Sequence, residues 1–345
     1  MPSPEPLAAG GGWRRTLSAI LGAALALALL VWALRGVHPA EVLVHLRNAH
    51  GAPLLAAVVV ATLTYPIRLI RWRLLLRDAD GGPLPAGPLW HAVAIGFMAN
   101  NTLPFRAGEV VRVLAATRLT GARFTSVLSS VAVERIFDGL TVVLLLSLAL
   151  LASDLPPGVV AGGVSVRHAA QVAGALGAAA LVAAVLVVLF PLPAERMVRR
   201  MLPAGRVTER LVAVLEGLRH GLSVLRSPAL LAGVVAWSLV LWLVNALAYY
   251  VGFAAFDIPV DFAGALLVQG ILIFGITVQL TPGFLGQFEA AIVAGLALFG
   301  VSNDLASSFA IAFHATTFVP IILLGAWSLA RTPVALTDLR APQRP

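Results

Sequence analysis

The sequence contains no cysteine and no lysine, and only 12% of its 345 residues are charged. Without cysteine there can be no disulfide, thiolate metal ligand or cysteine nucleophile, and the redox compartment stays undetermined. Without lysine there can be no phosphate-binding loop of the kind that ends in Lys-Ser or Lys-Thr, which excludes an ATP-driven pump. No histidine pair has zinc-protease spacing and no Gly-x-Ser-x-Gly motif occurs. We therefore expect no enzyme active site, no metal site and no cofactor.

Apolar residues make up 59% of the chain and the mean hydropathy is +0.94. Such a composition leaves too little polar surface for a water-soluble particle, so much of the molecule must face lipid. A membrane-crossing helix needs roughly 20 largely apolar residues. Six stretches come close to that length or exceed it: residues 17–34, 54–70, 126–151, 169–190, 229–253 and 305–330. The sequence thus predicts one all-α polytopic membrane domain over residues 1–345, with about six spanning helices.

The first of these stretches could also be a signal peptide, because it follows Trp13-Arg14-Arg15. However, the residues after it, beginning Arg35-Gly36-Val37, offer no small-residue cleavage site in a suitable place. We interpret it as a retained span.

Two further apolar regions, residues 89–103 and 262–280, are interrupted by proline. The first is short and runs into Asn100-Asn101-Thr102-Leu103-Pro104, and the second runs into Thr281-Pro282-Gly283 before another apolar run at residues 284–300. We interpret both as re-entrant helical hairpins that return to the side from which they came. The alternative is that every apolar run crosses the membrane.

The placement of arginine favours the re-entrant interpretation, because short cytoplasmic loops collect positive charge. With both termini inside and six crossings, 20 arginines fall on the inner side and three on the outer side. Residues 193–228 then form a basic cytoplasmic loop, within which residues 207–225 have the pattern of an amphipathic helix on the inner leaflet. The net charge of +8 fits the anionic inner face of a membrane better than nucleic acid.

The two proline-interrupted regions share a pattern in which a proline break is followed by glycine and then by glutamate at the start of the next helical stretch. The matching residues are Pro104, Gly108 and Glu109 in the first, and Pro282, Gly283, Gly286 and Glu289 in the second. A full span follows each, so residues 87–152 and 262–330 are predicted to be two units of an inverted repeat. Paired interrupted segments of this kind point to a transporter's central site, although Pro and Gly are also common in membrane helices.

Three ionisable residues lie within the span at residues 126–151, namely Glu134, Arg135 and Asp138. Arg135 can pair with Asp138 three residues on, which leaves a carboxylate that needs a cation such as Arg106 or Arg112. Such a network either binds a charged headgroup or only pins the hairpin to the span. Glu289 has no cation nearby in sequence, so it is either protonated, placed at a helix N-terminus, or a proton carrier.

Three motifs in this order resemble the flippase-like membrane domain of lysylphosphatidylglycerol synthases and its stand-alone relatives. They are Asn100-x-x-Leu103-Pro104-x-Arg106-x-Gly108-Glu109-x-x-Arg112, Ser130-Val131-x-x-Glu134-Arg135-x-x-Asp138 and Pro282-Gly283-x-x-Gly286-x-x-Glu289. The resemblance implies a polytopic helical protein that moves a polar-headgroup lipid between leaflets. It offers the named motif residues as candidates for the headgroup site or lipid path. The aminoacyl-transferring domain of the full-length synthases has no counterpart in this sequence, so we expect no synthase activity.

Two functions remain open from the sequence. The first is a lipid flippase or transporter of the bacterial inner membrane, and the second is a membrane partner that presents lipid to a separate synthase or glycosyltransferase. A membrane glycosyltransferase would need an acidic motif for a sugar nucleotide and metal, for which Asp257 and Asp261 are weak candidates. The expected partners are membrane lipids, and no nucleic acid.

Overall fold

A computed structural model describes residues 38–78, 81–103, 106–152 and 227–334, together with short pieces between residues 160 and 208. The predicted span at residues 17–34 and the amphipathic helix at residues 207–225 lie outside the described residues, apart from Thr208. The predicted span at residues 169–190 is described only in part.

Four helices in the described part are long and apolar enough to cross a membrane. They are α3 (Gly51–Leu75), α6 (Phe124–Ala152), α10 (Pro228–Ala254) and α13 (Asn303–Ala330). They coincide with four of the six predicted spans and confirm an α-helical membrane protein. Apart from these and the shorter helices, the described residues form one small β-hairpin of β1 (Val160–Ala161) and β2 (Val164–Ser165).

Two pairs of shorter helices fill the space between the long ones. The first hairpin consists of α4 (Ala86–Thr102) and α5 (Ala107–Thr120), which pack against each other. The second consists of α11 (Phe262–Gly275), the short 3-10 helix η2 (Pro282–Phe284) and α12 (Gln287–Ala297). Each break contains proline, which removes a backbone donor and ends regular helix. The helix α2 (Pro39–Asn48) packs outside them against α13.

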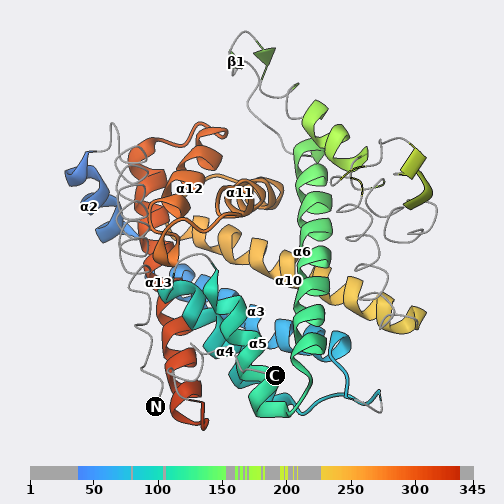
Figure 1. The fold of residues 1–345 in the computed structure, drawn as a ribbon. Helices are drawn as coiled ribbons and strands as arrows, with labels where there is room; N and C mark the ends of the chain where they lie inside the picture. The colour runs from blue at the N-terminus through green and yellow to red at the C-terminus, as the bar shows by residue number, and fades with distance from the viewer. Residues whose placement is uncertain are drawn as a thin grey trace, which may run out of the picture.

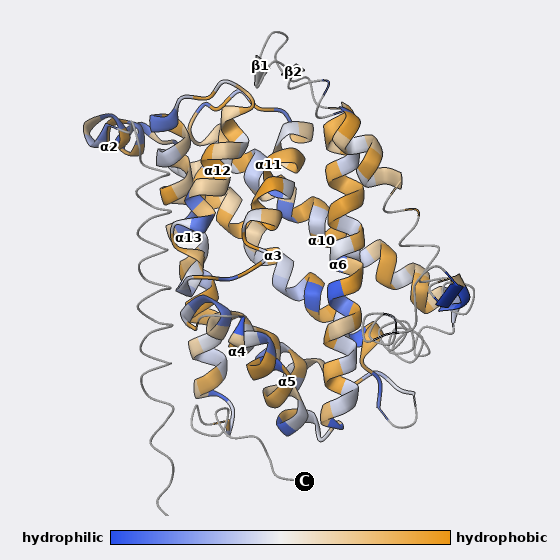
Figure 2. Ribbon diagram, turned by 45° about the horizontal axis from the view of Figure 1, so that its top comes forward, coloured by the Kyte–Doolittle hydropathy of each residue, from blue (hydrophilic) through white to orange (hydrophobic). Residues whose placement is uncertain are grey.

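The two hairpins lie in opposite halves of the molecule, with α4 and α5 at one end of α6 and α13, and α11 and α12 toward the other (Figure 1). Figure 2, a rotated view, shows the same separation. Helices α3 and α10 pack side by side and run obliquely to α6 and α13 (Figure 1). The long helices thus surround a centre that both hairpins reach.

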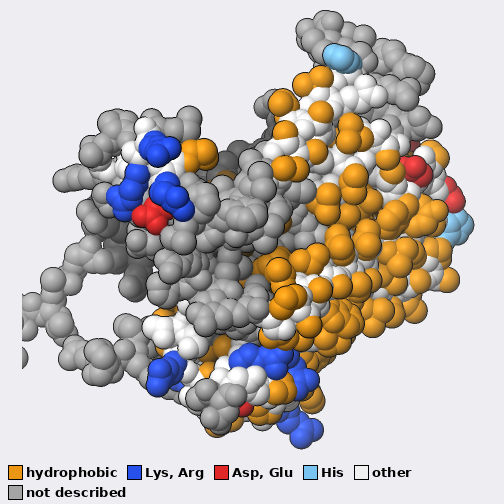
Figure 3. All heavy atoms as spheres, turned by 90° about the vertical axis from the view of Figure 1, so that its right-hand side faces the viewer, with side chains coloured by type: hydrophobic (Ala, Val, Ile, Leu, Met, Phe, Trp, Pro, Cys, Tyr) orange, Lys and Arg blue, Asp and Glu red, His pale blue; other side chains and the backbone are white. Residues whose placement is uncertain are grey.

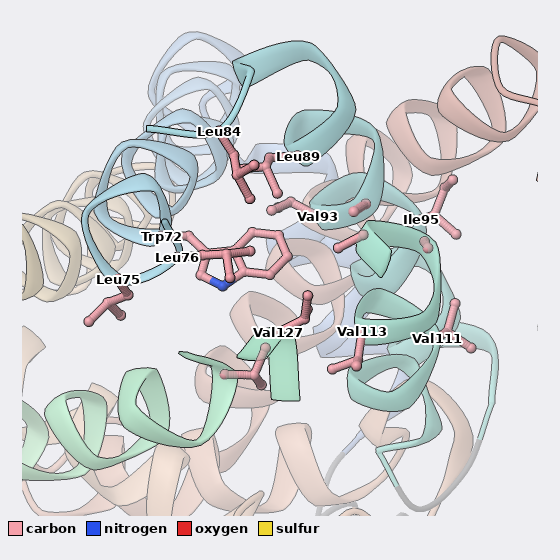
Figure 4. Packing of buried hydrophobic residues seen from close by; sticks show 14 of the residues in the cluster. Trp72, Leu75, Leu76, Leu84, Leu89, Val93, Ile95, Val111, Val113 and Val127 are labelled. Carbon is pink, nitrogen blue, oxygen red and sulfur yellow. The ribbon is translucent and has the colours of Figure 1, made fainter. Parts of the chain in front are cut away.

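Each half has its own hydrophobic core. In the half that contains the first hairpin, Trp72 of α3 is fully buried among Leu89, Val93 and Val127 (Figure 4). In the other half, Phe253 and Phe309 lie at the centre of a second cluster that includes residues of α11 and α12. Buried aromatic side chains of this size contribute strongly to packing.

A broad area of apolar side chains covers the face shown in Figure 3. Large side chains on the long helices stay exposed, including Leu148, Leu243 and Leu247. A water-soluble protein rarely exposes so extensive an apolar surface, whereas lipid tails favour it.

One boundary differs from the prediction and matters for function. The second span was predicted to end at residue 70, but α3 continues to Leu75 and buries both Arg68 and Arg71. Arginine is a good helix former, so the helix can continue through a position where hydropathy drops.

Candidate functional site

The first hairpin closes tightly because two glycines meet at its centre. A Cβ atom at Gly108 would overlap the carbonyl oxygen of Gly96 and the backbone nitrogen of Asn100. Glycine therefore lets the backbones of α4 and α5 approach more closely than any other residue would allow. This approach brings Arg112, on the same helix as Gly108, toward α6.

The tips of the two hairpins are joined by Arg106, which donates to the carbonyl oxygen of Ile276 at 3.2 Å, and above all by Gln279. Its amide group donates to the carbonyl oxygens of Asn100 at 2.7 Å and Leu103 at 3.1 Å, and its carbonyl accepts from the backbone N–H of Arg106 at 2.8 Å. Arg106 precedes α5 with a φ of 52°, a left-handed conformation unusual for a residue with a Cβ. Gln279 thus satisfies backbone groups at the break of the first hairpin, as a buried polar backbone requires.

Glu134 of α6 is fully buried and holds the first hairpin. Arg112 donates to both of its carboxylate oxygens, with N–O distances of 2.9 Å each. The guanidinium of Arg112 also lies 3.8 Å from the ring centre of Trp72, whose indole N–H donates to Ser130. A bidentate arginine–carboxylate pair stacked on an aromatic ring is among the stronger polar contacts in proteins.

Asp138, one turn further along α6, binds side chains from three helices. Arg71 donates to its Oδ1 at 2.6 Å and Trp242 of α10 donates to the same oxygen at 3.0 Å. Arg135 lies 3.2 Å from its Oδ2, so the predicted pairing of these two residues forms. Arg71 additionally donates to Ser238. We call Arg71, Arg112, Glu134 and Asp138 the inner layer of the cluster.

Arg106, Glu109 and Arg135 form an outer layer with longer contacts. Glu109 Oε1 lies 3.5 Å from Arg106 and 3.9 Å from Arg135, whereas Arg135 reaches Glu134 at 2.6 Å. The side chains of these three residues are 29–34% exposed, compared with at most 7% in the inner layer. The outer layer is therefore the most accessible part of the cluster.

The sequence predicted that six charged residues form one cluster, and the structure places them together. They are Arg106, Glu109, Arg112, Glu134, Arg135 and Asp138. The prediction missed Arg68 and Arg71, which approach Asp138 from α3 at 3.9 Å and 2.6 Å. The available signal was their spacing of three residues, which puts both on one face of a helix that continues beyond the apolar run.

A cavity of about 540 Å³ lies beside this cluster. One part of its wall is polar and includes Asn100, Arg106, Glu109, Arg135 and Asp138. The other part is apolar and comes mainly from α6, α11 and the second hairpin tip, with Val142, Val143, Ile273, Phe274 and Phe284. A cavity lined by both charged and apolar side chains suits an amphiphilic ligand.

The second hairpin uses its matching residues differently. Gly283 and Gly286 have φ values of 61° and 79°, which glycine adopts without strain. Glu289 is buried, accepts from the backbone N–H of Gly286 at 2.7 Å, and lies 2.7 Å from Nδ1 of His314. The helix N-terminus and a histidine 25 residues away thus supply its partners. Among the tip residues 282–289, only Phe284 lines the cavity.

Asp257 and Asp261 each have a local structural contact. Asp257 is exposed and lies 3.1 Å from His50, and Asp261 caps α11 by accepting from the backbone N–H of Gly264 at 2.7 Å. Among the described residues, no group of three or more His, Asp or Glu side chains could hold a metal ion.

Fold and site together define a helical integral membrane protein with a buried arginine–carboxylate cluster beside a cavity lined by charged and apolar side chains. Residues 19–325 match the family model described as the lysylphosphatidylglycerol synthase TM region, and the chain belongs to this family. It is also 31% identical over 309 residues to "Glycosyltransferase AglD" of Haloferax volcanii, covering 81% of this chain and 49% of that protein.

The chain therefore spans about half the length of that curated relative. Family and relative together identify a membrane protein connected with lipid or glycan handling.

Proposed function

We propose that the protein moves a polar-headgroup lipid between the leaflets of the bacterial inner membrane, with both termini in the cytoplasm. The observation that carries this proposal is the cavity of about 540 Å³, which is lined by charged and by apolar side chains and includes residues from both helical hairpins. A lipid in transit needs both: a polar surface for the headgroup and an apolar one for the tails.

The proposal includes an inverted repeat of residues 87–152 and 262–330. In its support, each hairpin is followed by a long helix, and the two hairpins approach the centre from opposite halves of the molecule (Figure 1). Interrupted helices with their tips at a central site are typical of secondary transporters. In this arrangement, the first hairpin enters from the cytoplasmic side and the second from the outer side.

Within the site, we assign the inner layer to structure and the outer layer to the headgroup. Glu134 and Asp138 have short contacts with arginines and little exposure, so they hold α3, α5 and α6 together. Arg106 and Arg135 face the cavity, and Glu109 lies between them. Movement of the headgroup past Glu109 would exchange these long contacts for contacts with the lipid.

The test is Glu109→Gln in protein reconstituted into vesicles, with a tail-labelled fluorescent lipid quenched from outside. We expect the melting temperature to stay near that of the parent, because a partly exposed pair contributes little to stability. Lipid translocation should fall at least about tenfold, the size of one charge-assisted contact. A variant that folds normally and moves lipid at the parental rate would remove Glu109 from the path.

A second candidate is a partner that presents lipid to a separate enzyme, or forms part of one. It is favoured by the name of the relative, a glycosyltransferase about twice as long as the region it shares with this chain. The two candidates differ in one measurement. A transporter moves lipid in vesicles that contain no other protein, whereas a partner requires its enzyme.

A further inference from the structure

The charged cluster contains more positive than negative groups, and this excess of positive charge points to the class of ligand. Ion pairs connect five arginines with three carboxylates, a formal charge of +2. These residues are Arg68, Arg71, Arg106, Arg112, Arg135, Glu109, Glu134 and Asp138. Uncompensated charge at membrane depth is costly, so a site of this kind favours a counter-ion of negative charge.

Hydrogen-bond donors in the same cluster are left over. Within the described residues, four arginines that line the cavity each have one buried guanidinium N–H group without a hydrogen-bond partner. They are Arg68 at Nη1 and Arg106, Arg112 and Arg135 at Nε. The side chain of Arg68 is only 9% exposed and its guanidinium lies 5.0 Å from the ring centre of Phe97, which fixes it at the cavity wall. Of the acceptors that line the cavity, Asn100 Oδ1 and Asp138 Oδ2 are also buried without a hydrogen-bond partner within the described residues, so unpartnered donors outnumber unpartnered acceptors by four to two. Such an excess of donors favours a ligand that mainly accepts.

The carboxylates offer little to a cation. Both oxygens of Glu134 bind Arg112, and both oxygens of Asp138 lie within 3.2 Å of an arginine. Glu109 is the carboxylate with the longest contacts, and it stands between Arg106 and Arg135. An ammonium group would have to lie beside these two guanidinium groups, which repel it.

We infer that the cavity binds a lipid whose polar end is a phosphate group of net negative charge, and that it discriminates against headgroups that carry an ammonium. This inference names the cargo class of the proposed function and rests on it. The phosphate oxygens accept from Arg106 and Arg135 at the mouth and from Arg68 further in, because guanidinium groups match phosphate geometry. The apolar wall at Val142, Val143 and Phe274 takes the tails.

A binding measurement tests the inferred headgroup class without requiring any transport. The protein in a neutral maltoside detergent is titrated with dihexanoyl phosphatidic acid, dihexanoyl phosphatidylcholine, lysylphosphatidylglycerol and inorganic phosphate, and melting temperature is recorded. We expect phosphatidic acid to stabilise the protein and to bind at least about tenfold more tightly than the other three. Equal or tighter binding of either ammonium lipid would overturn the inference. If inorganic phosphate bound as tightly as phosphatidic acid, the ligand would be the free anion and not a lipid, and the inference would be overturned.

A variant pair locates the binding. Arg106→Gln should weaken phosphatidic acid binding at least about tenfold, because it removes a guanidinium from the cavity mouth. Arg123→Gln is the matched control, since Arg123 is exposed and lies just before α6. If both variants weakened phosphatidic acid binding equally, the lipid would be held by general electrostatic attraction, and binding at the cavity mouth would be overturned. If Arg106→Gln does not fold, the ligand comparison on the unmodified protein still decides the headgroup class.

Translocation measured in reconstituted vesicles distinguishes a failure of this inference from a failure of the proposed function. Translocation of tail-labelled phosphatidic acid that is at least about tenfold faster than that of phosphatidylcholine supports both. Translocation of all lipids at one rate keeps the transporter and overturns the cargo class. Selective binding without any translocation keeps the cargo class and overturns the transporter.

Discussion

The first and second hairpins share the same Pro, Gly and Glu pattern but use it in different ways. In the first, Glu109 stands at the cavity with contacts of 3.5 Å and 3.9 Å. In the second, Glu289 is buried and bound at 2.7 Å by both Gly286 and His314. A repeated motif therefore does not guarantee a repeated role, because the partners of each glutamate decide whether it is available to a ligand.

The two hairpins also differ in how they are anchored. The first is attached to α6 by the charged pair of Arg112 and Glu134. The second is attached to α13 by Glu289 and His314, which are 2.7 Å apart, and its own break is held by neutral contacts, in which Gln287 accepts from the backbone N–H of Leu280 at 2.9 Å and donates to the carbonyl of Val278 at 2.9 Å. A charged anchor is costly to break, whereas each neutral hydrogen bond contributes about 1 kcal/mol.

The largest effect is expected from removal of the charged anchor. Glu134→Gln leaves Arg112 and Arg71 buried beside an amide without negative charge, and loss of one partner of a buried pair costs about 3–5 kcal/mol. The melting temperature and the yield of folded protein in detergent should fall sharply. Glu109→Gln is the control, because it removes a carboxylate from the same cluster at a partly exposed position. Equal stability of the two variants would contradict the division into layers.

A smaller effect is expected at the glycine contact inside the first hairpin. Gly108→Ala forces a Cβ atom against the backbone of α4, and overpacking of this kind costs about 1–3 kcal/mol. Gly87→Ala, also in this hairpin, is the matched control, since a Cβ atom there meets nothing within 4 Å. Thermal unfolding of both variants measures the difference. If the Gly108→Ala and Gly87→Ala variants had the same melting temperature, the close approach of the two backbones would be unimportant for stability.

The second hairpin should give the opposite pattern from Glu109→Gln. Glu289→Gln keeps an acceptor for the Gly286 N–H but weakens the contact with His314, so we expect a loss of about 1 kcal/mol in stability. Because Glu289 lies away from the cavity, lipid translocation per folded molecule should stay within about twofold of the parent. Vesicle translocation and thermal unfolding of the same preparations measure both quantities. If the Glu289→Gln variant had normal stability but no longer moved lipid, Glu289 would belong to the lipid path.

The sequence predicted the four long helices in the described part because their apolar runs are long, and it predicted the charged cluster because charge within a span requires partners. It did not predict the role of Arg71, whose partners on α6 and α10 lie 67 and 167 residues away. Gln279 was missed for the same reason, since its partners in the first hairpin are backbone atoms more than 170 residues away. The spacing of Arg68 and Arg71 indicates that they share a helix face, but a local pattern does not show which distant residues that face meets.

The smallest effect on stability, and the sharpest test of how the hairpins are oriented, comes from single cysteines in this cysteine-free chain. Ala116 lies within α5 of the first hairpin and is fully buried, so a cysteine there would not react from either side. Arg123 and Asn303 are exposed, at the starts of α6 and α13. If the hairpins enter from opposite sides, an impermeant thiol reagent should label Asn303→Cys in intact cells and Arg123→Cys only after permeabilisation. Surface substitutions of this kind change stability by at most about 0.5 kcal/mol, so labelling reports position rather than unfolding. External labelling of Arg123→Cys would place both hairpins on one side and would end the inverted repeat, since the arginines around the first hairpin would then lie outside against the positive-inside rule.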